Sequence, residues 1–208
     1  MRKVITIFAL AMLASVFFYQ AKAQDDKALI GKEAPSFKLK NIDGSMVSLD
    51  NYRRSEGVIV VFTCNHCPYS KLYEDRINEL NENYEAKGFP VIAINPNDPV
   101  AYPEDSWENM KVRAEEKAFS FPYLFDETQE IAAAYGATRT PHAYVLQFDE
   151  EEETFTVVYA GAIDDNPKES DQVEDKFIEK AIQEIKAGNA VSNNYTKAIG
   201  CSIKWKKS

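Results

Sequence analysis

The stretch Val58-Ile-Val-Val-Phe-Thr-Cys64-Asn-His-Cys67-Pro68 decides the fold. Its first part, 58–62, is a continuous run of β-branched and aromatic residues, which predicts a strand buried on both faces of a sheet. Apolar residues then recur every three or four positions over 69–86, ahead of a Lys-Gly pair, which predicts an amphipathic helix with a glycine stop. Two cysteines separated by two residues therefore lie where a buried strand turns into a helix.

Strands and helices alternate along the rest of the chain. A second apolar strand at 90–94 follows the helix, so 58–94 is a strand–helix–strand unit, typical of a parallel sheet with a crossover connection. Upstream, 34–49 alternates apolar and polar residues around a turn and predicts a β-hairpin. Downstream we expect helices at 106–117, 127–135 and 173–187, and strands at 123–125, 143–148 and 155–160.

An export signal precedes what we expect to be a single domain. Arg2 and Lys3 stand before an apolar run over 4–19 that ends at Ala21-Lys22-Ala23, the pattern of a secretory signal peptide cleaved after Ala23. The run is shorter than the ~20 residues that a membrane-spanning helix needs. We therefore expect a signal peptide at 1–23, one α/β domain at 28–190, an ordered or partly ordered tail at 191–208, and a periplasmic or extracellular protein without a membrane anchor.

The mature chain predicted in this way is strongly acidic. Removing residues 1–23 takes away three of the 24 basic residues and none of the 33 acidic ones, which leaves 185 residues with a net charge of −12. Such a surface repels nucleic acid and anionic lipid and favours solubility. The charge therefore argues against nucleic acid as a partner and directs attention to the cysteines.

The chain has three cysteines, Cys64, Cys67 and Cys201, and this odd number excludes a disulfide-stapled miniprotein. At a helix N-terminus the free amide hydrogens and the helix dipole stabilise a thiolate. We therefore expect Cys64 to be an exposed nucleophile and Cys67 to resolve the mixed disulfide. His66, inside the loop, would further favour the thiolate and the reduced form. The pair predicts a thiol-disulfide oxidoreductase that needs no cofactor.

Other interpretations of the cysteines stay open. Cys64 and Cys67 can instead form a static disulfide or remain buried thiols. A zinc or copper site is another alternative, and it would make the chain a copper-handling or binding protein. Cys201 is either a third redox thiol that the tail brings to Cys64 or, as we expect, a small apolar filler under the domain. The ligands that the sequence offers to a metal are the three cysteines, His66 and His142.

Five motifs in order along the chain resemble one known family. Together they resemble the peroxiredoxin-like branch of the thioredoxin superfamily, within the alkyl hydroperoxide reductase and thiol-specific antioxidant grouping, from about Ile30 to the tail. The resemblance implies a thioredoxin fold over 28–190, with a central mixed β-sheet flanked by helices, an N-terminal β-hairpin and a C-terminal tail. The motifs are Val60-Val-Phe-Thr-Cys-Asn-His-Cys-Pro68, Phe121-Pro-Tyr-Leu-Phe-Asp126, Thr140-Pro141, Gly161-Ala-Ile-Asp-Asp-Asn-Pro167 and Gly200-Cys-Ser-Ile-Lys-Trp205.

The resemblance also implies roles around the cysteine pair. It implies that Cys64 attacks, that Cys67 resolves, and that Pro141 is cis in a loop that faces both. The backbone of Thr140 would then be able to pair with a substrate chain as an added strand. The expected partners are protein or small-molecule disulfides and thiols, together with an unidentified redox partner.

Two departures from the family pattern limit what carries over. The peroxidase pattern Pro-x-x-x-Thr-x-x-Cys is missing, since Gly57 and Val61 stand seven and three positions before Cys64. A thiol peroxidase therefore remains the weaker alternative, for which Arg139 would stabilise the peroxidatic thiolate. Val58 stands where thioredoxin carries a buried aspartate that helps to deprotonate the resolving thiol. The candidates for a replacement base are His66, His142 and Glu74.

Overall fold

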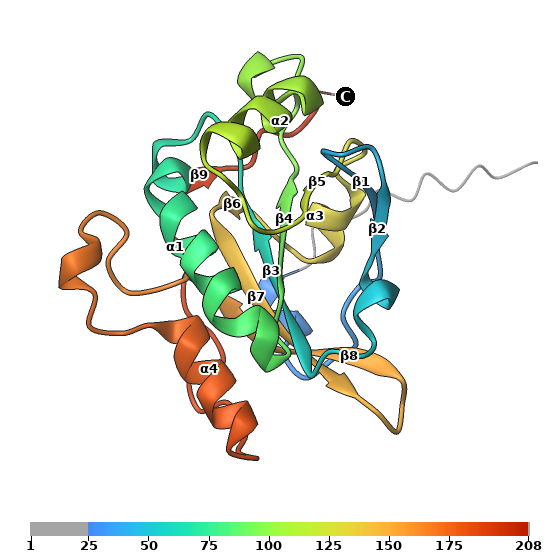
Figure 1. The fold of residues 1–208 in the computed structure, drawn as a ribbon, viewed down its shortest axis with the longest axis vertical. Coiled ribbons are helices and arrows are strands. Elements are labelled where there is room, and N and C mark those ends of the chain that lie inside the picture. The colour runs from blue at the N-terminus through green and yellow to red at the C-terminus, as the bar shows by residue number, and fades with distance from the viewer. Residues whose placement is uncertain (1–24, 208) are drawn as a thin grey trace, which may run out of the picture.

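The computed structural model describes residues 25–207, so the signal peptide predicted for 1–23 lies outside the described residues. Within 25–207, a seven-stranded sheet forms the centre of the molecule and helices lie on both of its faces (Figure 1). Among the helices of this part of the chain, none is both long and apolar enough to span a membrane. The arrangement confirms the predicted α/β fold with a central mixed sheet.

The sheet is mixed, because its three central strands run parallel and their neighbours run against them. Its strand order is β2-β1-β5-β4-β3-β7-β8, and a separate two-stranded sheet joins β6 to β9. The predicted hairpin is β1 with β2, at one edge. The strands are β1 (Lys38–Asn41), β2 (Met46–Ser48), β3 (Gly57–Phe62), β4 (Val91–Asn95), β5 (Tyr123–Phe125), β6 (Arg139–Thr140), β7 (His142–Asp149), β8 (Thr154–Gly161) and β9 (Cys201–Ser202).

Four α-helices are described, and each lies where the sequence predicts one. The helix predicted for 127–135 begins later, because Gln129 adopts a left-handed conformation with φ of 65° and cannot belong to the helix. The helix predicted for 173–187 also begins later, because Val173 is extended. The helices are α1 (Pro68–Tyr84), α2 (Trp107–Glu116), α3 (Glu130–Ala134) and α4 (Phe177–Lys186).

Strand β3 lies at the centre of the core and holds the cysteine loop at its end. Ile59 and Val61 contribute to the apolar cluster that contains α1 and α4 side chains. Val60 and Phe62 belong to the cluster on the opposite face, which contains α3 side chains. Because both faces are covered, the strand has no polar face, and this explains its unbroken apolar run. The chain therefore leaves β3 from a fixed point two residues before Cys64.

The C-terminal tail packs against the body of the molecule and is ordered to residue 207. In Figure 1 it passes beside β6 near the start of α1, where β9 pairs antiparallel with β6. Beyond β9, the Ile203 amide donates to Thr138 O at 3.0 Å, and the Lys204 amide donates to Asn97 Oδ1 at 2.8 Å. The domain boundary at residue 190 stays a prediction, but the tail is part of the folded unit.

Candidate active site

The site forms at the carboxyl end of the parallel strands β3 and β4. Loops that follow adjacent parallel strands meet at one edge of the sheet, which is where such folds commonly bind ligands. Here the loop 63–67 after β3 meets the loop 96–105 after β4, and the Thr63 amide donates to Ile94 O at 2.9 Å. The loop that contains the cis peptide between Thr140 and Pro141, as the resemblance implied, also contacts this edge.

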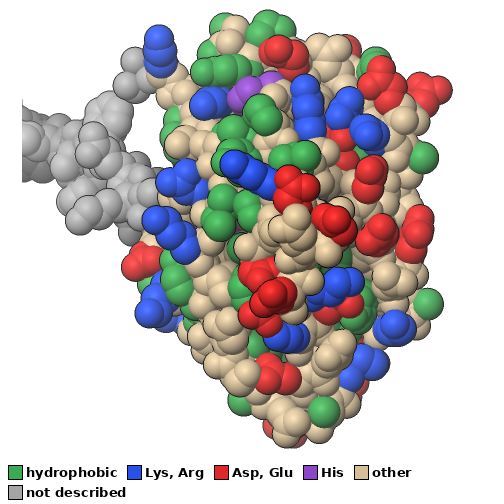
Figure 2. Space-filling model, turned by 90° about the vertical axis from the view of Figure 1, so that its left-hand side faces the viewer, with side chains coloured by type: hydrophobic (Ala, Val, Ile, Leu, Met, Phe, Trp, Pro, Cys, Tyr) green, Lys and Arg blue, Asp and Glu red, His purple; other side chains and the backbone are tan. Residues whose placement is uncertain are grey.

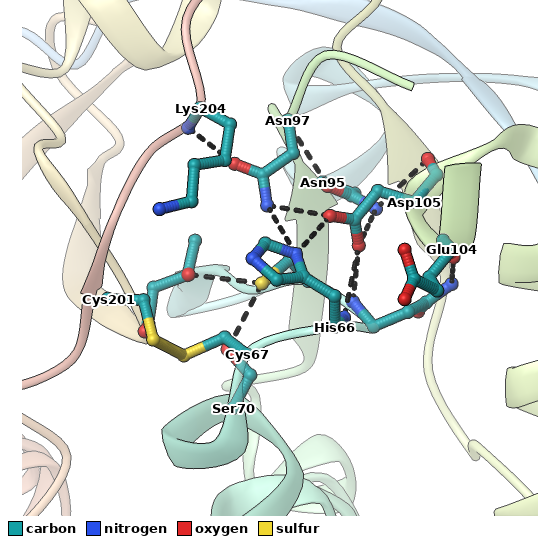
Figure 3. Close-up of polar contacts among 12 residues, drawn as sticks. His66, Cys67, Ser70, Asn95, Asn97, Glu104, Asp105, Cys201 and Lys204 are labelled. Carbon is teal, nitrogen blue, oxygen red and sulfur yellow. Dashed lines mark hydrogen bonds and ion pairs between the residues drawn. A yellow bond between two sulfur atoms is a disulfide. The ribbon is translucent and has the colours of Figure 1, made fainter. Parts of the chain in front are cut away.

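All three cysteines of the chain meet at this edge, and Figure 3 shows the disulfide between Cys67 and Cys201. Cys67 is the N-cap residue of α1 and forms a disulfide with Cys201, 134 positions later, across a Cα–Cα distance of 6.1 Å. Cys64 is the free thiol. The expectation that Cys201 merely fills space is wrong, because its sulfur is bonded to Cys67. Two sulfurs in a disulfide beside one free thiol are the components of a thiol-disulfide exchange.

The sulfur of Cys64 is enclosed, in contrast to the exposed nucleophile that the sequence predicts. Cys64 is only 2% exposed, because Thr140 and Ser70 lie against it. The Cys64 Sγ atom lies 3.1 Å from Thr140 Oγ1 and 3.6 Å from Ser70 Oγ. A small reagent or a client therefore reaches this sulfur less easily than the helix-start position alone indicates.

A buried carboxylate that the sequence analysis missed organises the cysteine loop. Asp105 is fully buried just before α2, and its Oδ1 accepts from the amides of Asn65 at 2.7 Å and His66 at 3.3 Å. Its Oδ2 accepts from Asn97 Nδ2 at 2.9 Å and lies 2.5 Å from His66 Nδ1. Since a carboxylate only accepts, His66 Nδ1 carries the proton in this contact. Asp105 therefore fixes both the loop backbone and the imidazole ring (Figure 3).

His66 is held as a cation next to the free thiol. Its contact with Cys64, opposed by burial and assisted by the hydrogen bond to Asp105, raises the pKa of His66 to about 9. Its ring stacks on Tyr102 with centroids 4.6 Å apart. The side chain of His66 is 16% exposed and that of His142 is buried, and Figure 2 shows a small histidine surface beside hydrophobic and basic side chains. An imidazolium in this place stabilises negative charge on the Cys64 sulfur.

The other two candidate bases have different partners. His142 is 1% exposed, and its Nε2 lies 3.2 Å from Asp26 Oδ2. Glu74 is also buried, and it receives two hydrogen bonds from the Arg113 guanidinium, at 2.7 and 2.6 Å. Of these three residues, His66 is the one that the structure places beside the free thiol, and as a cation it stabilises charge there instead of accepting a proton.

Arg139 holds the tail. Its Nη1 donates to Gly200 O at 2.8 Å, one residue before Cys201. Thr140 lies at the junction of the site, since its hydroxyl contacts Cys64 and its backbone pairs with Cys201. Its carbonyl oxygen lies 3.4 Å from Cys67 Sγ. The Arg139-Thr140-Pro141 loop therefore contacts the free thiol and both disulfide partners.

One feature of the sequence indicates that an acidic residue such as Asp105 lies near the cysteines. The polar loop Asn95-Pro-Asn-Asp-Pro99 follows the second parallel strand, so its residues must lie beside the cysteine loop. A carboxylate in that connection, directly before a predicted helix, is a candidate to face the cysteines. Which of its acidic residues does so depends on the path of the loop, which the sequence pattern does not give.

The metal site considered from the sequence is not assembled among the described residues. Cys67 and Cys201 are bonded to each other, and His142 lies with Asp26. Ligand atoms of Cys64, His66 and Asp105 do lie within 4.8 Å of one another. However, His66 Nδ1 and Asp105 are in direct hydrogen-bond contact, so no ion fits between those two atoms. Asp105 and His66 instead form a hydrogen-bonded pair of a carboxylate and a protonated imidazole.

Comparison with known proteins gives a consistent picture. The model of the AhpC/TSA family matches residues 30–165. The thiol-disulfide oxidoreductase ResA of Geobacillus thermodenitrificans is 26% identical over 146 residues, which cover 70% of this chain and 79% of ResA. ResA of Bacillus cereus is 25% identical over 148 residues, 71% of this chain and 81% of its own. These relatives are similar along most of their length.

Solved structures share the fold. An uncharacterized conserved protein from Geobacillus kaustophilus is 43% identical, with a TM-score of 0.78 over 86% of this chain and 93% of its own. A hypothetical protein from Sinorhizobium meliloti is 31% identical, with a TM-score of 0.77 over 86% of this chain and 96% of its own. Peroxidoxin BcpB from Mycobacterium tuberculosis, at 17% identity and a TM-score of 0.56 over 76% of this chain and 96% of its own, is similar in fold alone.

Proposed function

The chain belongs to the AhpC/TSA family, and we propose that it acts as a thiol-disulfide oxidoreductase through Cys64 and Cys67. One observation carries the proposal, namely that a free thiol lies beside a disulfide between the other two cysteines at the start of α1. Two of the cysteines are close in sequence, but Cys201 is brought in from the far end of the chain. The similarity of the chain to the ResA proteins supports the same chemistry.

The geometry favours Cys67 as the sulfur that bonds to a client. Cys67 caps α1, where the helix N-terminus stabilises a thiolate, and it already carries a disulfide to another segment of chain. Cys64, next to the His66 cation, is then the resolving thiol, and burial does not separate the two sulfurs, since Cys67 is 0% exposed and Cys64 is 2% exposed. This order is the reverse of the one expected from the sequence, because the sequence pattern does not show that Cys201 is bonded to Cys67.

In the direction of client reduction, the Cys67 thiolate attacks one sulfur of a client disulfide. A Cys67–client bond forms, the client disulfide breaks, and the second client sulfur leaves as a thiolate that takes a proton. The Cys64 thiolate then attacks Cys67 Sγ, which forms the Cys64–Cys67 bond and releases the first client sulfur as a thiol. Two electrons pass from the protein to the client, and client oxidation runs the same steps backwards.

Asp105 and His66 act as positioning residues for the second step. The His66 cation lies next to the sulfur that must be a thiolate to attack, and Asp105 fixes the ring through Nδ1. We place the reaction outside the cytoplasm, in the periplasm or extracellular space. The signal-like sequence at 1–23 supports that location, and a Cys67–Cys201 disulfide suits an oxidising compartment. The clients are protein or small-molecule thiols and disulfides.

Trapping of a mixed disulfide tests the two roles. Cys64→Ser with Cys201→Ser leaves Cys67 alone, and Cys67→Ser with Cys201→Ser is the matched variant that leaves Cys64 alone. After reaction with oxidised glutathione, we expect mass spectrometry to find stable glutathione adducts on Cys67 and few on Cys64. Preferential adducts on Cys64 would restore the order expected from the sequence. Insulin reduction by wild type no faster than by a variant with all three cysteines replaced would remove the proposed function.

A further inference from the structure

We propose that residues 200–205 are a built-in copy of the client strand, so that the tail shows which polypeptides the site accepts. The inference rests on the proposed function and adds a substrate class to it. The clients are extended polypeptides with glycine directly before the reacting cysteine and an apolar residue two positions after it.

The tail occupies the place that a client takes in a mixed disulfide. Cys201 is bonded to Cys67 and pairs through its backbone with Thr140, in the register Thr140↔Cys201 and Arg139↔Ser202. An extended segment that adds a strand to a short edge is a general mode of peptide recognition. Chemically, the Cys67–Cys201 bond is the same bond that a client cysteine forms with Cys67.

The residue before the cysteine lies too close to the cis-proline loop to carry a side chain. A Cβ atom built on Gly200 would lie 2.2 Å from Thr140 O and 2.6 Å from Thr140 C. Those atoms are backbone of the cis-proline loop, so they cannot turn aside as a flexible side chain does. Arg139 Nη1 also donates to Gly200 O, which holds the segment at this close approach. An external chain that lies in the same register therefore also needs glycine there.

After the cysteine, the site buries the side chain of Ile203 and leaves that of Ser202 exposed. Ile203 is 3% exposed within the apolar cluster on the α3 face of the sheet, and its amide donates to Thr138 O. Lys204 is held through its backbone, since its amide donates to Asn97 Oδ1 and its carbonyl accepts from the Asp98 amide at 2.9 Å. The site therefore selects the side chain at the second position after the cysteine, whereas the third residue, Lys204, is bound through its backbone and does not have to be a particular amino acid.

An internal exchange makes the edge available without any added oxidant or reductant. The Cys64 thiolate attacks Cys67 Sγ, the Cys64–Cys67 bond forms, the Cys67–Cys201 bond breaks, and Cys201 leaves as a thiolate that takes a proton. The number of disulfides is unchanged. The tail is then held by non-covalent contacts, namely its backbone pairing, the hydrogen bonds of Gly200 and Lys204, and the burial of Ile203, so a client strand of the same pattern competes with it.

Peptide kinetics test the inference on the full chain. The protein is the Cys64→Ser, Cys201→Ser variant, whose only thiol is Cys67. The probes are the peptide Gly-Cys-Ser-Ile-Lys-Trp with its cysteine activated by 5-thio-2-nitrobenzoate, and the same peptide with valine for glycine or with aspartate for isoleucine. The observable is release of the coloured thiol. We expect each replacement to slow the reaction about tenfold, as one overpacked or unfavourably buried contact does.

A second protein variant tests whether the tail competes with the peptide for the edge of β6. Gly200→Val in the same background displaces the tail from Thr140, so the glycine peptide should react about tenfold faster than with the intact tail. Oxidised glutathione serves as the reference, because it is too small to need the strand edge. Equal rates for the three peptides on both proteins would overturn the inference, whereas a Cys67 that reacts with neither peptides nor glutathione would overturn the proposed function itself.

Discussion

A single carboxylate determines the geometry of the cysteine loop. Asp105 accepts hydrogen bonds from two loop amides, two asparagine side chains and the His66 ring, while it is fully buried. A buried charge with several charge-assisted bonds is stable where it is, but it is costly to disturb. The reactive loop therefore keeps one conformation through its contacts with a different loop of the chain.

At this scale we predict that Asp105→Asn lowers the pKa of His66. The pKa of His66 is raised to about 9 by Cys64 first and by Asp105 as well. Loss of a neighbouring negative charge shifts a pKa by roughly 1 unit or more, so the variant should titrate closer to an ordinary histidine. NMR titration of the imidazole protons measures this directly, with His142→Gln to assign the two rings. An unchanged His66 titration would contradict the role of Asp105.

His66 also makes stability depend on pH. A histidine whose pKa is raised in the folded state stabilises the protein fully below the ordinary histidine pKa, about 6.5, and this contribution disappears as the pH rises through about 9. We predict that the urea midpoint of the reduced wild type falls between pH 7 and pH 10. Cys64→Ser, which removes the largest cause of the shift, should show a smaller fall. A fall of equal size in His66→Gln would assign the effect to other groups.

The sequence reveals the residues that are close in the chain and misses the contacts that are not. Cys64, His66 and Cys67 belong to one strand-to-helix turn, so their proximity follows from local structure alone. Asp105 and Cys201 reach the site from 38 and 134 positions beyond Cys67. Their placement depends on the path of a loop and on the docking of a tail. For the same reason, the burial of Cys64 beneath Thr140 has no local signal.

Among the secondary-structure elements, α1 and α2 determine how the two site loops face each other. The cysteine loop ends at the start of α1, and Asp105 lies just before the start of α2. Glu74 in α1 and Arg113 in α2 join the helices through two hydrogen bonds, and the side chain of Glu74 is only 4% exposed. The elements themselves were predictable from hydrophobic periodicity, but this connection between them was not.

We predict that Arg113→Ala lowers the free energy of unfolding by about 2 kcal/mol, because the buried Glu74 carboxylate loses two charge-assisted hydrogen bonds and keeps the Lys117 ammonium at 3.8 Å. Arg113→Met together with Glu74→Leu should recover most of the loss, since an apolar pair leaves no buried charge. Urea denaturation measures both. Arg53→Ala is the control, because its pair with Asp50 is exposed and should change stability by less than about 0.5 kcal/mol. A similar small change in Arg113→Ala would show that the bridge does not stabilise the fold.

Across the whole molecule, the two possible disulfides differ greatly in the length of chain that they close. The Cys67–Cys201 bond joins residues 134 positions apart, whereas a Cys64–Cys67 bond closes a loop of only four residues. In the chain-entropy description, a cross-link restricts the unfolded chain by about 5 kcal/mol in the first case and about 2 kcal/mol in the second. The internal exchange that releases the tail therefore also gives up part of the stability of the folded protein.

This difference predicts that oxidised Cys64→Ser, locked as Cys67–Cys201, is more stable than oxidised Cys201→Ser, locked as Cys64–Cys67, by about 3 kcal/mol. Urea unfolding without reductant measures the difference, after mass spectrometry has confirmed each bond. In excess reductant the two variants should differ by less than about 1 kcal/mol, because each then lacks one thiol and no cross-link remains. Equal midpoints of the oxidised variants would mean that the tail adds no restraint to the unfolded chain. The proposed exchange would then release the tail without lowering the stability of the protein that is ready to accept a client.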